Sequence, residues 1–312
     1  MFLANHQNAL LDALLIATHC KRKPYFLTRS DVFKTALLKV FFGFLQMIPV
    51  YRIRDGKNSL AGNTAIFERC AQLLGRGEAV LIFPEGNHSL KRRVRPLSKG
   101  FTRILFLALE SNPSMDIGIV PIGVNYANAA KFPDKAALYY GKEIRVQDFF
   151  DKKDVSGSAS RLKEEVYHHL KKLTTHIEEE SSYEEIVHTL DRAKVDYLDP
   201  AGVNRIIEEG TSPENRKIGK GKVGLMNYIF RGVFSILNFP MIIIWSMFIK
   251  PKVSEPEFLS TTRFMYALLF YPFFYLLFIA GMLEFLNWPA TSIICLAHLT
   301  LNIVLVKLSW ED

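Results

Sequence analysis

The sequence has few cysteines and no recognisable arrangement of metal ligands. Cys20, Cys70 and Cys295 are its three cysteines, they lie far apart, and none belongs to a CxxC or Cys/His pattern. An odd, scattered set argues against a disulfide framework and predicts a reducing compartment around the main domain. The spacing predicts no metal site either.

Two further patterns are missing. The first residues, Met1 to Ala4, run into polar Asn5 and His6 without the basic start and apolar core of a cleavable signal peptide. The net charge of +8 suits nucleic acid, anionic lipid or phosphorylated small molecules equally well. No basic-aromatic module of an RNA-binding protein is present, however, and long apolar segments favour lipid headgroups. We therefore expect membrane phospholipid, and no nucleic acid, as a partner.

The 312 residues divide by composition into three parts. Charged and apolar residues are interspersed up to about Gly210, whereas long apolar runs dominate after Val223. We predict an α/β domain over residues 1–155, a charged helical extension with a linker over 156–222, and a membrane region over 223–312.

Short apolar runs alternate with amphipathic stretches in the first part, which is typical of an α/β domain. The expected strands are Phe2–Ala4, Ile48–Arg52, Ala79–Phe83, Ile117–Val124 and Ala137–Tyr140. The expected helices are Ala9–Thr18, a helix capped by Asp31 that runs to Phe44, Asn63–Leu74 and Ser98–Glu110. This order predicts a mixed, largely parallel sheet flanked by helices.

The charged extension is expected to be helical over Ser158–Glu180. Ser182, followed three residues later by Glu185, fits a capping box that opens another helix. Residues 211–222 contain Pro213 and four cations, which is typical of a linker.

Three apolar segments follow, at Gly232–Ile249, Phe264–Leu283 and Ala290–Val306. Asn238 and Pro240 interrupt the first segment. If the basic residues on both sides of it stay cytoplasmic, this segment is a hairpin or an in-plane helix pair broken near Pro240, followed by two true crossings. Three full crossings are the alternative. The charge asymmetry favours the hairpin, and we expect His298, in the third segment, to lie near the headgroups.

Four stretches combine turn-forming, polar and titratable residues beside the expected strands. They are Asn5–Asp12, Pro49–Arg52, Phe83–Ser89 and Ile119–Gly123. In open α/β sheets a ligand binds beside the carboxyl ends of the strands, where all four are expected to lie.

These stretches, in this order, resemble the motifs of the glycerolipid and lysophospholipid acyltransferase family over about Phe2–Asp151. The family places four residues between its catalytic His and Asp, whereas His6 and Asp12 enclose five. The family also carries an upstream strand and helices, while here only five residues precede His6. The true start therefore lies further upstream, or the domain is a shortened form.

The resemblance implies that His6 is the general base for attack of an alcohol on a thioester and that Asp12 orients and supports it. A neutral imidazole suits this role near pH 7. The resemblance places Glu85 and Gly86 on the acceptor side and Pro121 on the acyl-donor side, and it makes Arg52 a phosphate ligand. Where the family has Thr-Arg, this chain has Asn87 and His88, so we expect charge from the following basic residues, Arg92 among them, to help bind phosphate.

The resemblance thus implies an integral membrane O-acyltransferase of phospholipid synthesis whose catalytic domain lies on the cytoplasmic face. Its acyl donor would be acyl-CoA or acyl carrier protein, with no bound cofactor, and its acceptor glycerol-3-phosphate or lysophosphatidic acid. Two alternatives stay open at this point. One is acylation of another lipid or alcohol, and the other is a non-catalytic membrane module that binds lipid or phosphate.

Overall fold

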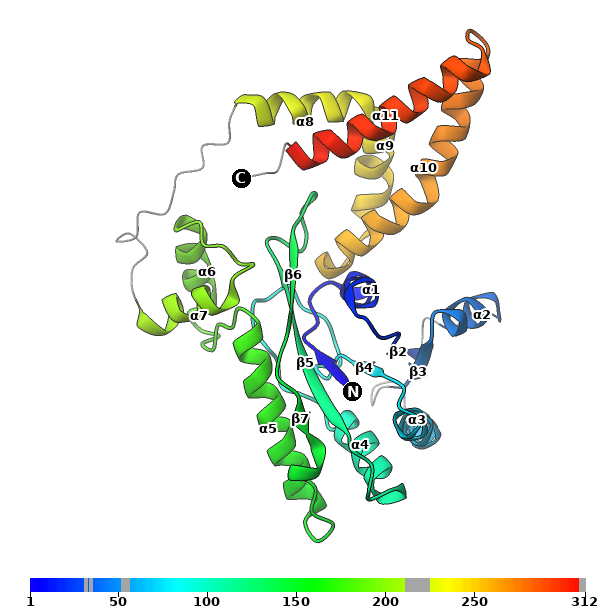
Figure 1. Cartoon of the computed structure of the whole chain (residues 1–312). Coiled ribbons are helices and arrows are strands. Elements are labelled where there is room, and N and C mark those ends of the chain that lie inside the picture. The colour runs from blue at the N-terminus through cyan, green and yellow to red at the C-terminus, as the bar shows by residue number, and fades with distance from the viewer. Residues whose placement is uncertain (31–32, 34–35, 52–56, 211–224, 309–312) are drawn as a thin grey trace. The chain divides into compact units, whose positions relative to one another are not determined.

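The computed structural model describes residues 1–30, 33, 36–51, 57–210 and 225–308 (Figure 1). The chain forms two compact units. The first comprises Met1–Ala127 and Lys135–Asn215, and the second comprises Asn128–Asp134 and Arg216–Asp312. The short segment Asn128–Asp134 therefore belongs to the second unit although the residues on both sides of it belong to the first.

The first unit is built on one mixed sheet. Its strands, within the described residues, are β1 (Phe2–Ala4), β2 (Tyr25–Arg29), β3 (Met47–Val50), β4 (Val80–Ile82), β5 (Gly118–Tyr126), β6 (Ala136–Tyr140) and β7 (Ile144–Arg145). The order is β3-β2-β4-β1-β5-β6, and β7 pairs with β5. Pairs among the first five strands are parallel, and β6 and β7 run antiparallel to β5. Pro49 lies on the edge strand β3, where the lack of an N–H donor is tolerated.

Helices in the first unit include α1 (Ala9–His19), α2 (Ala36–Phe44), α3 (Lys57–Gly75), α4 (Gly100–Ser111), α5 (Val155–Leu173), α6 (Tyr183–Arg192) and α7 (Pro200–Glu209). The core joins both kinds of element: Leu3, Val80 and Ile119 of the sheet and Phe101 and Ile104 of α4 are fully buried. Burial of such apolar side chains contributes about 1.5–3 kcal/mol each.

The predicted fold class is confirmed, although several elements differ from the prediction. The strand β7 was not expected, and α3 begins at Lys57 where the prediction had Asn63. The strand β2 was not expected, because the run Tyr25–Arg29 is short and follows a cationic stretch. Of the helix expected from Asp31 to Phe44, the structure describes Ala36–Phe44, and Asp31 lies outside the described residues.

The helical extension differs more from expectation. The helix expected to reach Glu180 ends at Leu173, because the chain turns into an extended conformation at Thr174. The helix α6 does begin after Ser182, but the Ser182 side chain makes no capping hydrogen bond, so the predicted capping box is wrong. The unexpected α7 is capped by Asp199, whose Oδ1 accepts from the Gly202 N–H at 3.1 Å.

The second unit is helical and apolar. Its main helices, in the described part of the chain, are α8 (Leu225–Leu237), α9 (Phe239–Ile244), α10 (Leu259–Leu283) and α11 (Trp288–Leu308). Two stretches, Pro256–Leu283 and Trp288–Leu308, are long and apolar enough to cross a membrane. Met226–Leu237 and Phe239–Lys252 form a pair bent by 85°, and the bend lies at Asn238, two residues before Pro240. This is where the sequence predicted a break.

A buried polar network surrounds this bend. Asn238 donates to Asn302 Oδ1 at 2.7 Å and accepts from the Tyr271 hydroxyl at 3.0 Å. His298 lies 2.8 Å from the Tyr275 hydroxyl and 3.3 Å from the Leu237 carbonyl. His298 is buried halfway along α11. Its position near the headgroups stays a prediction. Because apolar surroundings make unpaired polar groups costly, these side chains find partners in one another and in the Leu237 carbonyl at the bend.

Candidate active site

The loops that follow β1 and β4 meet at one edge of the sheet. These strands are parallel neighbours, so His6 and Glu85, a few residues beyond their carboxyl ends, emerge on the same side. The Ser89 N–H donates to the His6 carbonyl at 3.0 Å and joins the two loops. The His6 ring stacks on Phe83, with ring centroids 4.0 Å apart, and meets the edge of His88 at 5.6 Å. The site therefore combines two stretches that are far apart in sequence.

His6 and Asp12 form a close pair. The distance from His6 Nδ1 to Asp12 Oδ2 is 2.8 Å, Asp12 is fully buried and the His6 side chain is 16% exposed. An ionised carboxylate only accepts hydrogen bonds, so this contact places the imidazole proton on Nδ1. Nε2 is then left with a lone pair and can accept a proton.

The Asp12 carboxylate is saturated with donors. Oδ2 also accepts from the backbone N–H groups of Gln7 at 2.7 Å and Asn8 at 2.8 Å, and Oδ1 accepts from the Tyr126 hydroxyl at 2.6 Å. Ala9, the first residue of α1, has a φ of 39°, in the left-handed region that costs a non-glycine residue about 1 kcal/mol or more. This turn brings Asp12 back to His6 although five residues separate them.

Tyr126 was not predicted as part of the site. It is the last residue of β5, the parallel neighbour of β1, so its position beside the end of β1 follows from strand order. Strand order cannot be read from the sequence with certainty, because any two of the expected strands could be neighbours. A buried tyrosine at the carboxyl end of a central strand was the available signal.

Glu85 is paired with Arg95 in a largely buried position. Arg95 Nε and Nη2 donate to Glu85 Oε2 at 2.8 and 2.6 Å, and the Glu85 side chain is 2% exposed. The other carboxylate oxygen, Oε1, is buried and has no partner in the described part of the chain. Burial raises the pKa of Glu85 from 4.5 to about 7, although the Arg95 guanidinium favours the ionised form.

This shift predicts a pH-dependent stability that Glu85→Gln would remove. Below pH 4.5 the carboxyl is neutral in both the folded and the unfolded state. Between pH 4.5 and about 7 the unfolded state loses its proton first, so the wild-type protein loses stability as the pH rises, by on the order of 3 kcal/mol in full. The unfolding temperatures of both proteins would be measured in detergent at pH 5 and pH 8. That of Glu85→Gln, relative to wild type, should be higher at pH 8 than at pH 5. A constant difference would mean that Arg95 keeps Glu85 ionised throughout.

The other predicted residues take varied positions. Gly86 adopts a φ of 72°, which suits glycine at this turn, and the Asn87 carbonyl accepts from Arg95. His88 is buried beside His6, and Pro121 is buried within β5 opposite Leu3. Arg52 lies outside the described residues.

Arg92 has contacts that its predicted role did not suggest. Its Nη1 and Nη2 donate to the backbone carbonyls of Tyr126 at 2.9 Å and Ala127 at 2.7 Å. Its guanidinium carbon lies 3.3 Å from the centre of the Tyr197 ring. The side chain is thus directed to the main chain at the end of β5.

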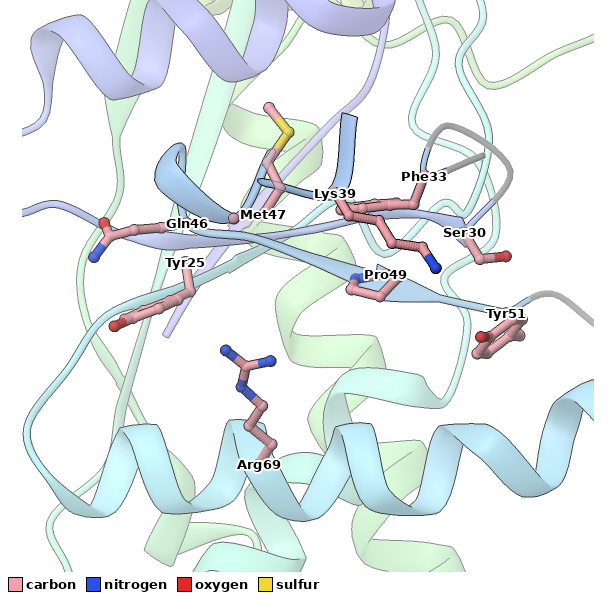
Figure 2. A pocket seen from close by; sticks show the side chains of 10 residues that line it. Tyr25, Ser30, Phe33, Lys39, Gln46, Met47, Pro49, Tyr51 and Arg69 are labelled. Carbon is pink, nitrogen blue, oxygen red and sulfur yellow. The ribbon is translucent and has the colours of Figure 1, made fainter. Parts of the chain in front are cut away.

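A separate pocket lies at the β2–β3 edge of the sheet (Figure 2). Its volume is about 520 Å³, and its lining includes Tyr25, Met47 and Tyr51 together with the cations Lys39 and Arg69. Neither His6 nor Asp12 lines it.

Comparison with known proteins concerns mainly the first part of the chain. Residues 1–125 match the family model described as Acyltransferase, and this segment contains His6, Asp12, Glu85 and Pro121. Residues 1–125 are a domain of the glycerolipid acyltransferase family. The family predicted from the sequence motifs is thereby confirmed.

Curated relatives of the acyltransferase domain include two yeast proteins. The chain is 26% identical over 83 residues to Glycerol-3-phosphate O-acyltransferase 1 of Saccharomyces cerevisiae, and 32% identical over 84 residues to Glycerol-3-phosphate O-acyltransferase 2 of that organism. Each match covers 27% of this chain and 11% of the relative. The matched part therefore spans about a tenth of the length of these relatives.

Among solved structures, the 1-acyl-sn-glycerophosphate (LPA) acyltransferase PlsC from Thermotoga maritima aligns with a TM-score of 0.38 and 16% identity. The alignment covers 57% of this chain and 67% of that chain.

Proposed function

We propose that this chain is a membrane-bound O-acyltransferase of phospholipid synthesis. It transfers a fatty acyl group from acyl-CoA or acyl carrier protein to a hydroxyl of glycerol-3-phosphate or lysophosphatidic acid. The observation that carries the proposal is the 2.8 Å contact between His6 Nδ1 and the buried Asp12 carboxylate, in a domain of the acyltransferase family. A lipid-binding module without activity does not need a histidine whose tautomer is fixed by a buried carboxylate that accepts several hydrogen bonds.

The proposed reaction proceeds by direct transfer. His6 Nε2 takes the proton of the acceptor hydroxyl as its oxygen attacks the carbonyl carbon of the thioester. The new C–O bond forms, the C–S bond breaks, and the leaving thiolate receives the proton from the His6 imidazolium. Asp12 stabilises that imidazolium while it carries the charge and keeps the ring oriented.

The loop after β4 supplies the acceptor side of the proposed site. Glu85, Gly86, Asn87 and His88 are assigned there because Phe83 and His88 contact the His6 ring, which places this loop beside the base. Arg52 and Pro121 keep the roles that the family resemblance implies, as a phosphate ligand and as part of the acyl-donor side.

Turnover by the full chain in detergent tests the proposal. Purified protein would be supplied with an acyl-CoA or an acyl carrier protein, together with glycerol-3-phosphate or lysophosphatidic acid. Free thiol and the new ester, measured by a thiol reagent and mass spectrometry, should appear in equal amounts. Thiol release without ester, or no turnover with any pair, would contradict the proposal. Lipid analysis after expression in an acyltransferase-deficient host would identify the acceptor.

We also propose that the acyltransferase domain lies on the cytoplasmic face and that the bent pair α8–α9 does not cross the membrane. Lys250, Lys252 and Arg263 lie between this pair and the apolar part of α10, whereas the turn between α10 and α11 contains Glu284 and no cation. Positive residues stay on the cytoplasmic side, so α10 and α11 would form one outward and one return crossing.

Cysteine labelling gives a direct measurement of this arrangement. In a variant without native cysteines, an impermeant maleimide applied from the non-cytoplasmic side should label Asn287→Cys, in the α10–α11 turn, but not Ser254→Cys, next to Lys252. Labelling at Ser254→Cys from that side would instead favour three full crossings. Permeabilised membranes, in which both positions should react, provide the control.

A further inference from the structure

Tyr126 extends the His6–Asp12 pair to a third side chain. Its hydroxyl donates to Asp12 Oδ1 at 2.6 Å, and both residues are buried. His6 occupies the other oxygen, Oδ2, at 2.8 Å. A carboxylate held at both oxygens cannot rotate about its Cβ–Cγ bond without losing hydrogen bonds. Tyr126 at Oδ1 therefore acts with the Gln7 and Asn8 N–H groups at Oδ2 to fix the oxygen that faces His6.

Arg92 fixes the strand end that carries Tyr126. It donates to two successive carbonyls, those of Tyr126 and Ala127, at 2.9 and 2.7 Å. These residues form the end of β5, where its pairing with β6 finishes at Tyr126 and Ala136. A guanidinium presents two parallel donors, whereas an ammonium group cannot reproduce this geometry.

Arg92 is in turn held by the α6–α7 segment, residues 174–209. The Tyr197 ring lies under its guanidinium at 3.3 Å, and the Tyr183 hydroxyl accepts from its backbone N–H at 2.7 Å. The Arg92 carbonyl accepts from the Ile177 N–H at 3.0 Å. Tyr183, Tyr197 and Ile177 are all buried in the small apolar core of this segment, so the contacts to Arg92 come from one packed body.

A further backbone contact joins the same two stretches. The Val94 N–H donates to His176 Nδ1 at 3.0 Å, while His176 Nε2 lies 3.0 Å from Glu178 Oε2. Burial lowers the pKa of His176, which favours the neutral ring that can accept at Nδ1. The loop at residues 92–94 is thus bound to the α6–α7 segment through both its side chains and its backbone.

We propose that Tyr126 and Arg92 are positioning residues for Asp12, and that the α6–α7 segment holds them in place. The chain of contacts runs from Tyr197 to Arg92, to the end of β5, to the Tyr126 hydroxyl and to Asp12. The inference rests on the proposed function, since it concerns the orientation of the proposed base. It assigns a positioning role to the α6–α7 segment, which lies outside residues 1–125, the residues that the family model matches. It also replaces the phosphate-binding role that the sequence suggested for Arg92.

Tyr126→Phe removes only the hydroxyl that contacts Asp12. We expect kcat to fall about 10-fold with each KM changed less than about 2-fold, because the base loses orientation while the substrates keep their contacts. Tyr266→Phe is the matched control. Tyr266 is buried like Tyr126, and its hydroxyl also donates a hydrogen bond, at 2.8 Å to the Met241 carbonyl within the second unit. That variant should keep wild-type kcat and fold as well as Tyr126→Phe by circular dichroism.

A double-mutant cycle separates positioning from simple destabilisation. If Tyr126 acts through Asp12, Tyr126→Phe should have little further effect on kcat in an Asp12→Asn background. Full additivity, or wild-type kcat in the single variant, would overturn the inference. Arg92→Lys keeps the charge but loses the paired donors, so its kcat should fall as much as that of Tyr126→Phe. If the Arg92→Lys variant kept wild-type kcat, Arg92 would have no part in positioning Asp12.

The two proposals fail in different ways. If no acyl transfer is detected for the wild-type protein, the proposed function fails and the positioning inference fails with it. If wild type is active, His6→Ala is inactive and Tyr126→Phe matches wild type, the positioning inference alone fails.

Discussion

His6→Ala should lower kcat for acyl transfer by at least about 100-fold, the usual scale for loss of a general base. We expect the chemical step to slow, because the contact of Nδ1 with Asp12 leaves Nε2 as the ring nitrogen that can accept a proton. Few nearby side chains could replace His6 as the base in this variant. His88 lies beside the His6 ring, which it meets edge-on with ring centroids 5.6 Å apart.

His19→Ala provides the matched control for this experiment. His19 is exposed at the end of the same helix that carries Asp12, and its Nδ1 contacts two local groups, the Leu15 carbonyl and the Thr18 hydroxyl. Its kcat should stay within about 2-fold of wild type. Added imidazole that partly restores His6→Ala would identify the missing group as a base, whereas equal rates for His6→Ala and wild type would remove His6 from the mechanism.

The sequence predicted the parts of the site that depend on local patterns. Local pattern marked the stretches that hold His6 and Asp12, and Glu85 and Gly86, as polar turns beside expected strands, and the resemblance to the acyltransferase family then gave these residues their roles. The fold class followed from the same alternation of short apolar runs and amphipathic helices. The two stretches meet in space because β1 and β4 are parallel neighbours.

The parts that were missed depend on contacts between distant segments. Tyr126 reaches Asp12 across 114 positions, and Arg92 and Tyr183 meet across 91. Charge suggested that Arg92 helps to bind phosphate, and a sequence cannot show that two of its N–H groups donate to backbone carbonyls. The contacts of His298 were missed for the same reason, because its partners, Tyr275 and the Leu237 carbonyl, lie on other helices.

Asp12→Asn should lower kcat by about 10³-fold, between the contribution of a general base and that of a buried triad carboxylate. The amide can occupy the same space. Its oxygen can replace Oδ2 and accept from His6 and from the Gln7 and Asn8 N–H groups, while its NH₂ donates to the Tyr126 oxygen. The fold and the position of His6 should therefore be retained, and what disappears is the negative charge that stabilises the imidazolium during transfer.

Asp12→Ala tests whether charge or position matters more. It removes the acceptor as well and leaves the buried N–H groups of Gln7 and Asn8 and the Tyr126 hydroxyl without their partner, at a cost of about 1–3 kcal/mol for each unsatisfied group. The Ala variant should thus unfold at a clearly lower temperature than the Asn variant, while both lose a similar factor in kcat. If Asp12→Asn stayed within a few-fold of wild type, the buried charge would have no part in the reaction. Asp12 would then serve to shape the turn between β1 and α1, and His6 would act as a base without its support.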